Sequence, residues 1–254
     1  MLFYFTASGN TLHVAKHLDT DLHSIPQVMK QDNLVFEGET IGVVFPTYAG
    51  QAPKMVFEFL KKATFKTDYL YLIATYGKDD TVICERTTVL LKEMGKEVAY
   101  ANSVIMVDNY LPSFDMREQE AIDKNEAGQI AAIVEDLKNR KHYIKEANQG
   151  QRDFFASATK LFAENPNLIN GFQITVKENC IGCGICSQVC PMGLFVIENG
   201  VARKTQVECQ FCLACAHACP QKAITTCIKD TNPNERFRHE GISLMDIINS
   251  NKQI

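Results

Sequence analysis

The sequence predicts an α/β protein: a doubly wound parallel sheet of five strands, followed by a small α+β domain rich in cysteine. In residues 1–115, short apolar runs alternate with amphipathic segments, which is typical of a parallel sheet covered by helices on both faces. Beyond residue 170, eight of the ten cysteines fall in two blocks of like spacing. We therefore expect a sheet domain at 1–148, a connector helix at 149–170, a cysteine-rich domain at 171–230, and a tail with a helix at 231–254.

Five apolar runs account for the predicted strands of the sheet domain. They lie at 2–5, 41–45, 69–75 and 98–107, with a weaker run at 22–25. Apolar residues at helical spacing between these runs predict helices at 11–18, 54–61 and 81–94. The charged segment 116–147 also has apolar residues at helical spacing, and predicts the last helix that covers the sheet.

The remaining elements follow from turn and helix signals. The segment 153–163 predicts a connector helix, which Asn165-Pro166 ends, and which we expect to dock the two modules. A strand begins the next domain at 172–176, and the turn Glu198-Asn199-Gly200 predicts a hairpin over 194–203. In the tail, Arg236 and Arg238 flank Phe237, so the tail either binds a carboxylate or the sheet domain or forms a solvated turn before a helix at 242–249.

The two cysteine blocks carry the strongest chemical signal. The ligand candidates are Cys180, Cys183, Cys186 and Cys190 in the first block, and Cys209, Cys212, Cys215 and Cys219 in the second. The Cys-x2-Cys-x2-Cys-x3-Cys-Pro spacing directs three thiolates to one 4Fe–4S cluster and the fourth to the other cluster. The first cluster would then take Cys180, Cys183, Cys186 and Cys219, and the second would take Cys209, Cys212, Cys215 and Cys190. Both blocks resemble a bacterial two-cluster ferredoxin.

Other uses of these cysteines fit less well. A structural zinc ion needs four ligands and would leave half of the thiols unused. Disulfides suit small secreted chains, and nothing in this sequence looks secreted. Two cysteines remain outside the blocks, Cys84 and Cys227, and we expect both to be buried as small apolar side chains.

Composition limits the possible partners and locations. The net charge of −4 offers no basic surface, so we expect no nucleic acid partner. No apolar stretch is long enough to span a membrane. The N-terminus, Met-Leu-Phe-Tyr-Phe, lacks the features of a signal peptide, which favours the cytoplasm. His13 and His17 stand four apart on a predicted helix, but no third ligand is near in sequence, and solvated or capping histidines are the simpler interpretation. His217 lies between Cys215 and Cys219, so it either tunes the potential of a cluster through its N–H group or has a simple packing role.

The loop after the first strand predicts an anion site. It reads Thr6-Ala7-Ser8-Gly9-Asn10-Thr11 and leads into a helix, so hydroxyls, backbone N–H groups and the helix dipole converge there. Nucleoside triphosphate loops have a lysine after the glycine, and this loop has none. The Gly-x-Gly-x-x-Gly pattern of dinucleotide sites is also missing. The loop suits a phosphate monoester, and it resembles the FMN phosphate loop of flavodoxins.

Two further loops at the same edge of the predicted sheet strengthen this resemblance. They are the segments 45–53 and 74–80, each with a tyrosine and a glycine. The resemblance to flavodoxins implies that Tyr48 or Tyr76 lies against the flavin ring, with backbone near Gly50 and Gly77 at its polar edge. Ordinary loop aromatics and turn glycines are the alternative. A fourth segment, 108–110, and the tail resemble parts of flavodoxin–ferredoxin fusion proteins. The implied FMN contacts are Thr6, Ser8, Gly9, Asn10, Thr11, Pro46, Thr47, Tyr48, Ala49, Gly50, Thr75, Tyr76, Gly77, Asn109 and Tyr110.

These features predict an electron carrier in which FMN and two 4Fe–4S clusters form one relay, since flavin handles one or two electrons and each cluster handles one. A redox protein of the ferredoxin, flavodoxin or oxidoreductase type is the expected partner, in an anaerobic setting. Two alternatives stay open: a flavin-dependent reductase that acts on a small oxidant or a quinone, and a redox sensor. The sequence leaves the oligomeric state open.

Overall fold

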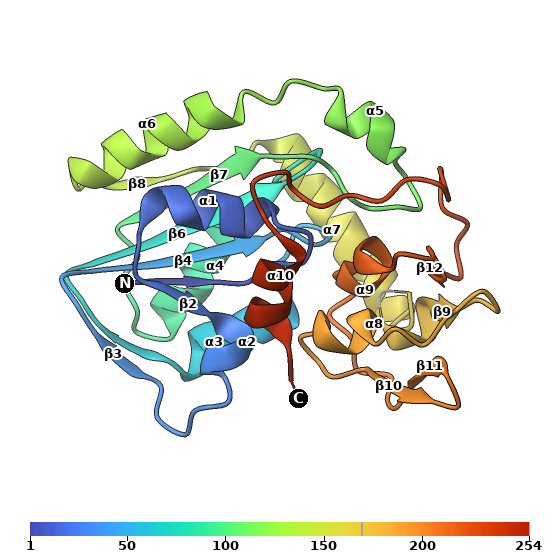
Figure 1. Ribbon diagram of the computed structural model, residues 1–254. Coiled ribbons are helices and arrows are strands. Elements are labelled where there is room, and N and C mark those ends of the chain that lie inside the picture. Colours follow the sequence, from blue (N-terminus) through green and yellow to red (C-terminus); the bar gives the residue numbers. More distant parts are fainter. Residues whose placement is uncertain (169, 254) are drawn as a thin grey trace. The chain divides into compact units, whose positions relative to one another are not determined.

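A computed structural model describes residues 1–168 and 170–253 of the protein (Figure 1). Packing contacts divide the chain into two compact units. Unit 1 contains Met1–Thr6, Asn10–Val107 and Asp123–Ala158, and unit 2 contains Ala7–Gly9, Asp108–Ile122 and the chain from Thr159 onward. The short segment Ala7–Gly9 thus groups with unit 2, although the residues on both sides of it belong to unit 1.

A parallel sheet forms the centre of unit 1. Its strands, in spatial order, are β2 (Leu22–Ser24), β1 (Leu2–Tyr4), β4 (Thr40–Pro46), β6 (Tyr69–Tyr76), β7 (Tyr100–Ile105) and β8 (Tyr143–Ile144). Numbered within this sheet alone, the order is 2-1-3-4-5-6. This is the flavodoxin-like order of a doubly wound sheet with one more strand at the edge. The predicted fold class is confirmed.

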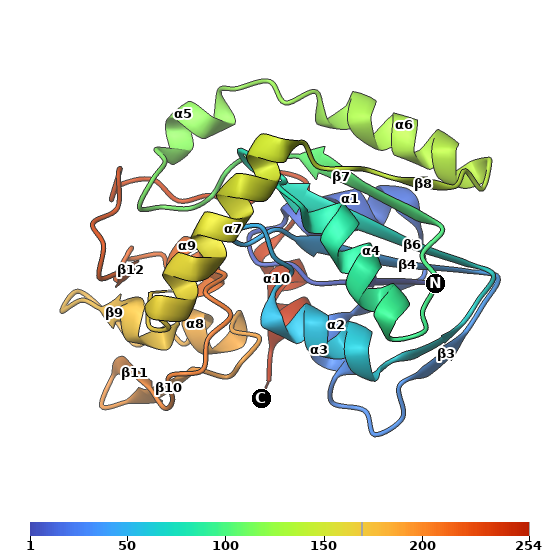
Figure 2. The same cartoon turned by 180° about the vertical axis from the view of Figure 1, so that it is seen from behind.

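Helices cover both faces of this sheet (Figures 1 and 2). Helices α1 (Asn10–Leu18) and α6 (Glu126–Lys138) lie on one face, and α3 (Lys54–Lys62) and α4 (Ile83–Glu93) lie on the other. The strands are continuously apolar because both of their faces are buried, as Val43 and Val44 on β4 illustrate. Phe3 on β1 packs against Phe59 on α3 with ring centroids 5.0 Å apart.

The structure departs from the predicted sheet at its edge. A sixth strand, β8, lies inside the segment 116–147 that the sequence predicts as one helix. That segment instead contains α5 (Met116–Glu120), α6 and β8. A strand of two residues is too short to show an alternating pattern, so Ile144 fits a helical spacing by chance. The structure also adds the short helix α2 (Ile25–Val28) and a small parallel pair, β3 (Val35–Glu37) with β5 (Thr64–Lys66).

Unit 2 contains short elements that connect the cysteine blocks. Its strands β9 (Ile174–Val176) and β12 (Ile224–Thr226) pair antiparallel, as do β10 (Phe195–Glu198) and β11 (Val201–Lys204). The latter pair is the predicted hairpin. Its turn residues Asn199 and Gly200 have φ of 52° and 75°, which a type I′ turn requires. Unit 2 also contains α8 (Ile185–Gln188), α9 (Ala214–Ala218), α10 (Leu244–Asn251) and the 3₁₀ turn η1 (Gly171–Gln173), and α5 groups with it as well.

The predicted connector helix is α7 (Gln149–Glu164), which ends before Asn165-Pro166 as expected. Its first part, to Ala158, groups with unit 1 and the rest with unit 2. In unit 1, Phe155 packs with Val82 and Ala147, and the Arg86 guanidinium lies 5.0 Å from the centroid of its ring.

Across residues 1–168 and 170–253, no helix combines the length and the apolar character that a membrane crossing demands.

Candidate iron–sulfur and flavin sites

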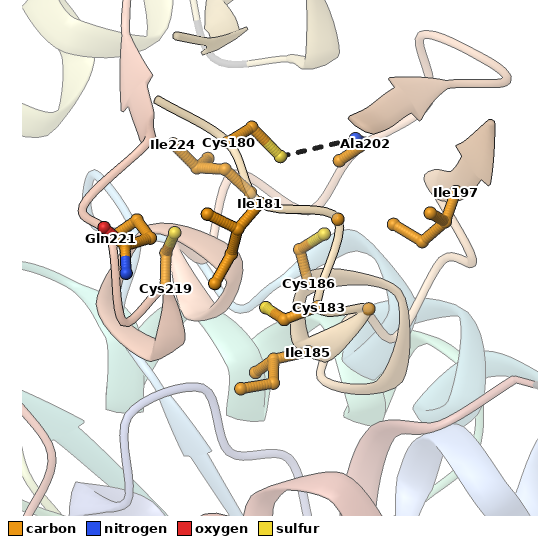
Figure 3. A pocket seen from close by; sticks show the side chains of 12 residues that line it. Cys180, Ile181, Cys183, Ile185, Cys186, Ile197, Ala202, Cys219, Gln221 and Ile224 are labelled. Carbon is orange, nitrogen blue, oxygen red and sulfur yellow. Dashed lines mark hydrogen bonds between the residues drawn. The ribbon is translucent and has the colours of Figure 1, made fainter. Parts of the chain in front are cut away.

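Four cysteines of unit 2 line one pocket (Figure 3). Cys180 and Cys183 lie in the loop before α8, Cys186 lies on α8, and Cys219 ends α9. Three of these thiols come from the first block and one from the second, which is the crossed set that the spacing assigns to one cluster. Soft thiolate donors on one pocket fit an iron–sulfur cluster.

Backbone N–H groups point at the sulfurs of both predicted ligand sets. Ala202 donates to Cys180 Sγ at 3.4 Å, and Ala223 donates to Cys219 Sγ at 3.3 Å. In the other set, Leu194 donates to Cys190 Sγ at 3.3 Å, and Phe211 donates to Cys209 Sγ at 3.2 Å. Such bonds stabilise the negative charge on a cluster and help to set its potential.

The two sets differ in their access to solvent. Cys183 of the pocket set is exposed, whereas Cys190, Cys212 and Cys215 of the other set are buried. Burial raises the pKa of Cys186 to about 12 and that of Cys209 to about 11, so both thiols are protonated at neutral pH unless a metal binds. Iron that bound at these thiols would therefore have to displace their protons.

His217 lies on α9 between Cys215 and Cys219, and it is buried. Its Nδ1 accepts a hydrogen bond from the backbone N–H of Phe237 at 3.1 Å, and its Nε2 is 2.9 Å from the carbonyl oxygen of Asn109. A carbonyl only accepts and a backbone N–H only donates, so the proton sits on Nε2. Burial lowers the pKa of His217 to about 4, which keeps the ring neutral.

A buried ion pair holds the C-terminal tail in unit 2. Arg236 Nη2 is 3.0 Å from Asp230 Oδ2, and both side chains are less than a tenth exposed. The same guanidinium donates from Nε to the carbonyl of Ala216 on α9, and Thr225 Oγ1 donates to Asp230 Oδ1. Of the alternatives left open for the tail, the carboxylate partner is the one found for Arg236.

Three of the predicted flavin loops meet at one edge of the sheet in unit 1. Thr11 Oγ1 at the start of α1 is 2.9 Å from Thr75 Oγ1 at the end of β6, and both residues are buried. The Thr47 backbone N–H, just after β4, donates to the Thr75 carbonyl at 2.7 Å. Asn10 donates from Nδ2 to the carbonyl of Val107 at 2.9 Å. The carboxyl ends of β1, β4 and β6 are thereby tied together.

Polar atoms in these loops fit a polar ligand. Asn10 Oδ1 and Thr47 Oγ1 are buried and have no hydrogen-bond partner among the described residues. Because an unpaired buried polar atom costs about 1–3 kcal/mol, such atoms are expected where a ligand supplies the partner. The loops of unit 1 thus fit a bound group with donors and acceptors of its own, as FMN has.

The loop after β4 is a tight turn. Tyr48 and Gln51 exchange two backbone hydrogen bonds of 2.8 and 3.0 Å around Ala49 and Gly50, whose φ angles are 50° and 79°. A Cβ at Gly50 would lie 2.6 Å from Thr81 Oγ1 and 2.7 Å from Phe155 Cδ2. Gly50 is therefore required both by backbone conformation and by space.

A charged network that the sequence did not predict lies beside Tyr76. Lys145 Nζ is 2.7 Å from Asp80 Oδ2, 2.8 Å from Ser103 Oγ and 5.5 Å from the Tyr76 ring centroid. Burial lowers the pKa of Lys145, but the hydrogen bond and charge of Asp80 outweigh this and leave it raised. Asp80 is the last residue of the predicted loop 74–80, whereas Lys145 follows β8, the strand that the sequence missed.

The other predicted flavin residues group with unit 2. Asn109 donates from Nδ2 to Ser8 Oγ, and the backbone N–H of His239 donates to the Ser8 carbonyl at 2.9 Å. Gly9 has φ of 109°, and a Cβ there would lie 2.9 Å from the Cβ of His239. Tyr110 contacts Phe211 with ring centroids 6.3 Å apart. Unit 1 holds Thr6, Asn10, Thr11, Pro46, Thr47, Tyr48, Ala49, Gly50, Thr75, Tyr76 and Gly77, and unit 2 holds Ser8, Gly9, Asn109 and Tyr110.

The two cysteines outside the blocks differ from each other. Cys84 on α4 is buried, as predicted, and burial raises its pKa to about 12. Cys227 is exposed, so the prediction that it is buried is wrong. Along β12, Ile224 and Thr226 face inward, and the alternation of a strand puts Cys227 on the outer face.

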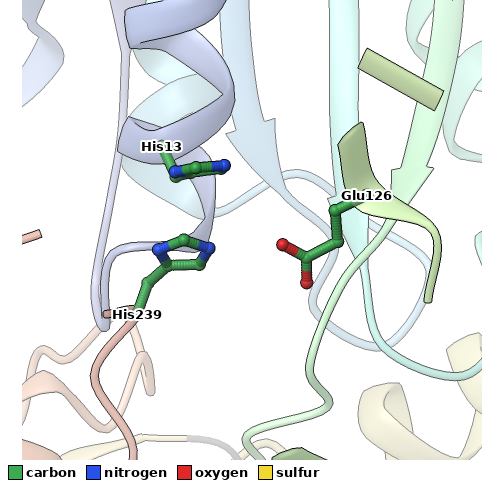
Figure 4. A group of neighbouring side chains, drawn as sticks. All are labelled: His13, Glu126 and His239. Carbon is green, nitrogen blue, oxygen red and sulfur yellow. The ribbon is translucent and has the colours of Figure 1, made fainter. Parts of the chain in front are cut away.

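The first histidine pair has a simple structural role. His17 Nδ1 donates to the backbone carbonyl of His13, one turn earlier on α1, at 2.9 Å, which agrees with an ordinary exposed helix position. Within unit 1, the ring of His13 also approaches the carboxylate of Glu126 at the start of α6 to within 4.8 Å (Figure 4).

Comparisons with known proteins match the cysteine-rich region. The family model of the 4Fe-4S dicluster domain matches residues 173–220. A ferredoxin of Methanocaldococcus jannaschii is 39% identical over 71 residues, covering 25% of this chain and 44% of the relative. A second ferredoxin of that organism is 40% identical over 72 residues, covering 25% of this chain and 94% of the relative. A ferredoxin of Thermococcus litoralis is 38% identical over 53 residues, covering 19% of this chain and 86% of the relative.

Solved structures match only at a low level. The Trp repressor binding protein from Bacillus subtilis aligns with a TM-score of 0.34 and 10% identity, over 54% of this chain and 98% of that chain. Rubredoxin oxygen:oxidoreductase from Desulfovibrio gigas aligns with a TM-score of 0.32 and 14% identity, over 53% of this chain and 35% of that chain. TM-scores below 0.5 establish nothing further about this protein.

Three observations indicate a ferredoxin of the 4Fe-4S type in the cysteine-rich region. They are the pocket with four cysteines, the family model, and the relatives that are matched over most of their length. The chain spans less than half of the length of the first Methanocaldococcus jannaschii ferredoxin. Through its residues 173–220, the chain belongs to the ferredoxins of the 4Fe-4S dicluster type.

Proposed function

We propose that this protein is an electron-transfer iron–sulfur flavoprotein, which relays electrons between FMN and two 4Fe–4S clusters in the cytoplasm of an anaerobe. Its ferredoxin region supports electron transfer in general. The observation that carries the flavin half is the pair of buried, unpartnered atoms Asn10 Oδ1 and Thr47 Oγ1 in loops tied together at the carboxyl edge of the sheet.

The cysteines would hold the clusters in the crossed arrangement. Cys180, Cys183, Cys186 and Cys219 would hold one cluster, and Cys209, Cys212, Cys215 and Cys190 the other. The shared pocket of the first four supports this assignment. The N–H groups directed at the sulfurs would favour the reduced, more negative state of each cluster.

FMN would bind at the loops after β1, β4 and β6. Thr11, Asn10 and the rest of the loop Thr6–Thr11 would hold its phosphate at the N-terminus of α1, where the helix dipole favours negative charge. Tyr48 or Tyr76 would lie against the ring. When bound, FMN supplies exchange between one-electron and two-electron carriers. The partner would be another redox protein.

The test of this function is the cofactor content and the selectivity for the phosphate. Protein purified without oxygen should contain about eight iron and eight labile sulfide per chain, with FMN. Ser8→Ala/Thr11→Ala removes two hydroxyls, each worth about 1.5–3 kcal/mol towards a charged group, so FMN should bind at least about tenfold more weakly with iron unchanged. Riboflavin that binds the parent protein as tightly as FMN would contradict the phosphate site, and four iron or stoichiometric zinc would contradict the clusters.

The relay itself has a kinetic test. After rapid reduction of the clusters, the rate of FMN reduction should not depend on protein concentration if both groups exchange electrons within one chain. Phe155→Ser/Phe162→Ser, which changes two apolar residues of α7, should slow this step and leave both cofactors bound. A rate that rises in proportion to protein concentration would replace the relay by exchange between molecules.

A further inference from the structure

Unit 2 contains a closed set of hydrogen bonds that joins the phosphate loop to the helix between the cysteines. We call it the polar ring, and its members are Ser8, Asn109, His217, Phe237 and His239. Asn109 donates from its amide to Ser8 Oγ, and its carbonyl accepts from His217 Nε2 at 2.9 Å. His217 Nδ1 accepts from the Phe237 N–H at 3.1 Å, and two residues later the His239 N–H donates to the Ser8 carbonyl at 2.9 Å.

The direction of these bonds fixes what Ser8 offers to a ligand. A hydroxyl has one proton and two acceptor lone pairs. One lone pair of Ser8 Oγ accepts from the Asn109 amide, so its proton remains free to be donated elsewhere. Ser8 is buried, and its carbonyl is also occupied by the His239 N–H. The residue is therefore held from two sides with a hydrogen-bond donor to spare.

Asn109 depends in turn on His217. The backbone carbonyl that accepts from His217 and the side-chain amide that donates to Ser8 both belong to Asn109. Fixing the backbone carbonyl therefore also limits where the side-chain amide points. His217 is well suited to fix the Asn109 carbonyl, because its imidazole is buried. The backbone N–H of Phe237 donates to the other imidazole nitrogen, which leaves only one tautomer. The side chain comes from α9, which carries Cys215 and ends at Cys219.

We propose that His217 is a positioning residue for the phosphate of the flavin: through Asn109 it orients the Ser8 hydroxyl towards a phosphate monoester. This inference rests on the proposed FMN site. It makes the phosphate loop depend on a side chain more than two hundred residues away in sequence. Recognition of the phosphate is thereby built partly by the helix between the cluster ligands.

The test compares the affinities for FMN and riboflavin, because only the phosphate distinguishes these two ligands. His217→Phe keeps a flat ring but removes both hydrogen bonds, and it should lower the preference for FMN over riboflavin about fivefold, the value of one hydrogen bond. His217→Gln retains an amide donor and acceptor and should recover most of the preference. His142→Phe, the same replacement at an exposed position of unit 1, should leave it unchanged. All proteins are compared with their iron in place.

A second variant keeps the test valid if His217→Phe loses iron or fails to fold. Asn109→Ala leaves α9 untouched and removes only the amide that reaches Ser8, and it should give the same loss of preference. The inference is overturned if Asn109→Ala, or a folded His217→Phe, discriminates FMN from riboflavin as well as the parent. A parent protein that itself shows no preference for FMN would overturn the proposed flavin site as well, and is recognised before any variant is measured.

Discussion

The buried pair of Asp230 and Arg236 allows the anchoring of the C-terminal tail to be measured. Asp230→Ala leaves the Arg236 guanidinium, which is only 7% exposed, without its carboxylate. Breaking a buried ion pair from one side costs about 3–5 kcal/mol, because an uncompensated charge stays buried. The exposed pair of Arg117 and Glu235, at 2.7 Å with 75% and 31% exposure, has the same chemistry. Arg117→Ala should cost much less, because solvent screens this exposed pair.

Amide hydrogen exchange of the intact protein reports this cost locally. The backbone N–H groups of Phe237 and His239 are both hydrogen-bonded, so they exchange only when the tail opens. A loss of about 3–5 kcal/mol should accelerate their exchange between about 100-fold and 5,000-fold in Asp230→Ala, against about fivefold or less in Arg117→Ala. Replacing both partners, as Asp230→Leu/Arg236→Met, should restore most of the protection. Equal acceleration in the buried and exposed variants would refute the reasoning.

Three further changes test the packing, the ligand sets and the charged network. Gly50→Ala and Gly95→Ala impose similar backbone strain at φ of 79° and 74°, but of the two only Gly50 lacks space for a Cβ. In urea unfolding, Gly50→Ala should therefore be less stable than Gly95→Ala by about 1–3 kcal/mol. Equal unfolding midpoints would show that the loop moves to make room for the Cβ. Cys219→Ser and Cys180→Ser should leave the same residual cluster by electron paramagnetic resonance, and Cys190→Ser the other one; identical spectra of Cys219→Ser and Cys190→Ser would exclude the crossing. Lys145→Met should destabilise the protein at neutral pH. Because the pKa of Lys145 is raised above its ordinary 10.5, the difference in melting temperature between the parent and this variant should persist up to pH 10.5 and close only above it. A difference that closes below pH 9 would contradict the pairing with Asp80.

The sequence predicts most of unit 1 because the two central strands of its sheet are long and buried on both faces. β4 and β6 are continuous apolar runs, and their lengths leave little room for another assignment. β8 has two residues and pairs only through Tyr143 and Ile144, so its existence depends on the edge of β7 and not on a local pattern. Lys145 follows that strand, and its place beside Tyr76 was therefore hidden as well.

The predicted sites show the same limit. The spacing of the cysteines was enough to indicate which four thiols would line one pocket, because ligands that are close in sequence constrain each other. Two roles for His217 were open from the sequence, but neither Asn109 nor Phe237 is near it in sequence, so its hydrogen bonds were not foreseeable. Cys227 was assigned to the interior from its apolar neighbours, although its exposure depends on the inward and outward alternation of β12, which ends at the residue before it.

The contact between Ser8 and His239 also bears on when the protein becomes competent during synthesis. More than two hundred residues separate the two, and a ribosome adds about 5–20 residues per second. Ser8 therefore waits roughly ten to fifty seconds for the backbone group that binds its carbonyl. During that interval the strands of unit 1 have time to pair, but the turn Ala7–Gly9 lacks its neighbours from the tail. The loop reaches its final form late, and any group that binds there would be loaded after translation of the tail.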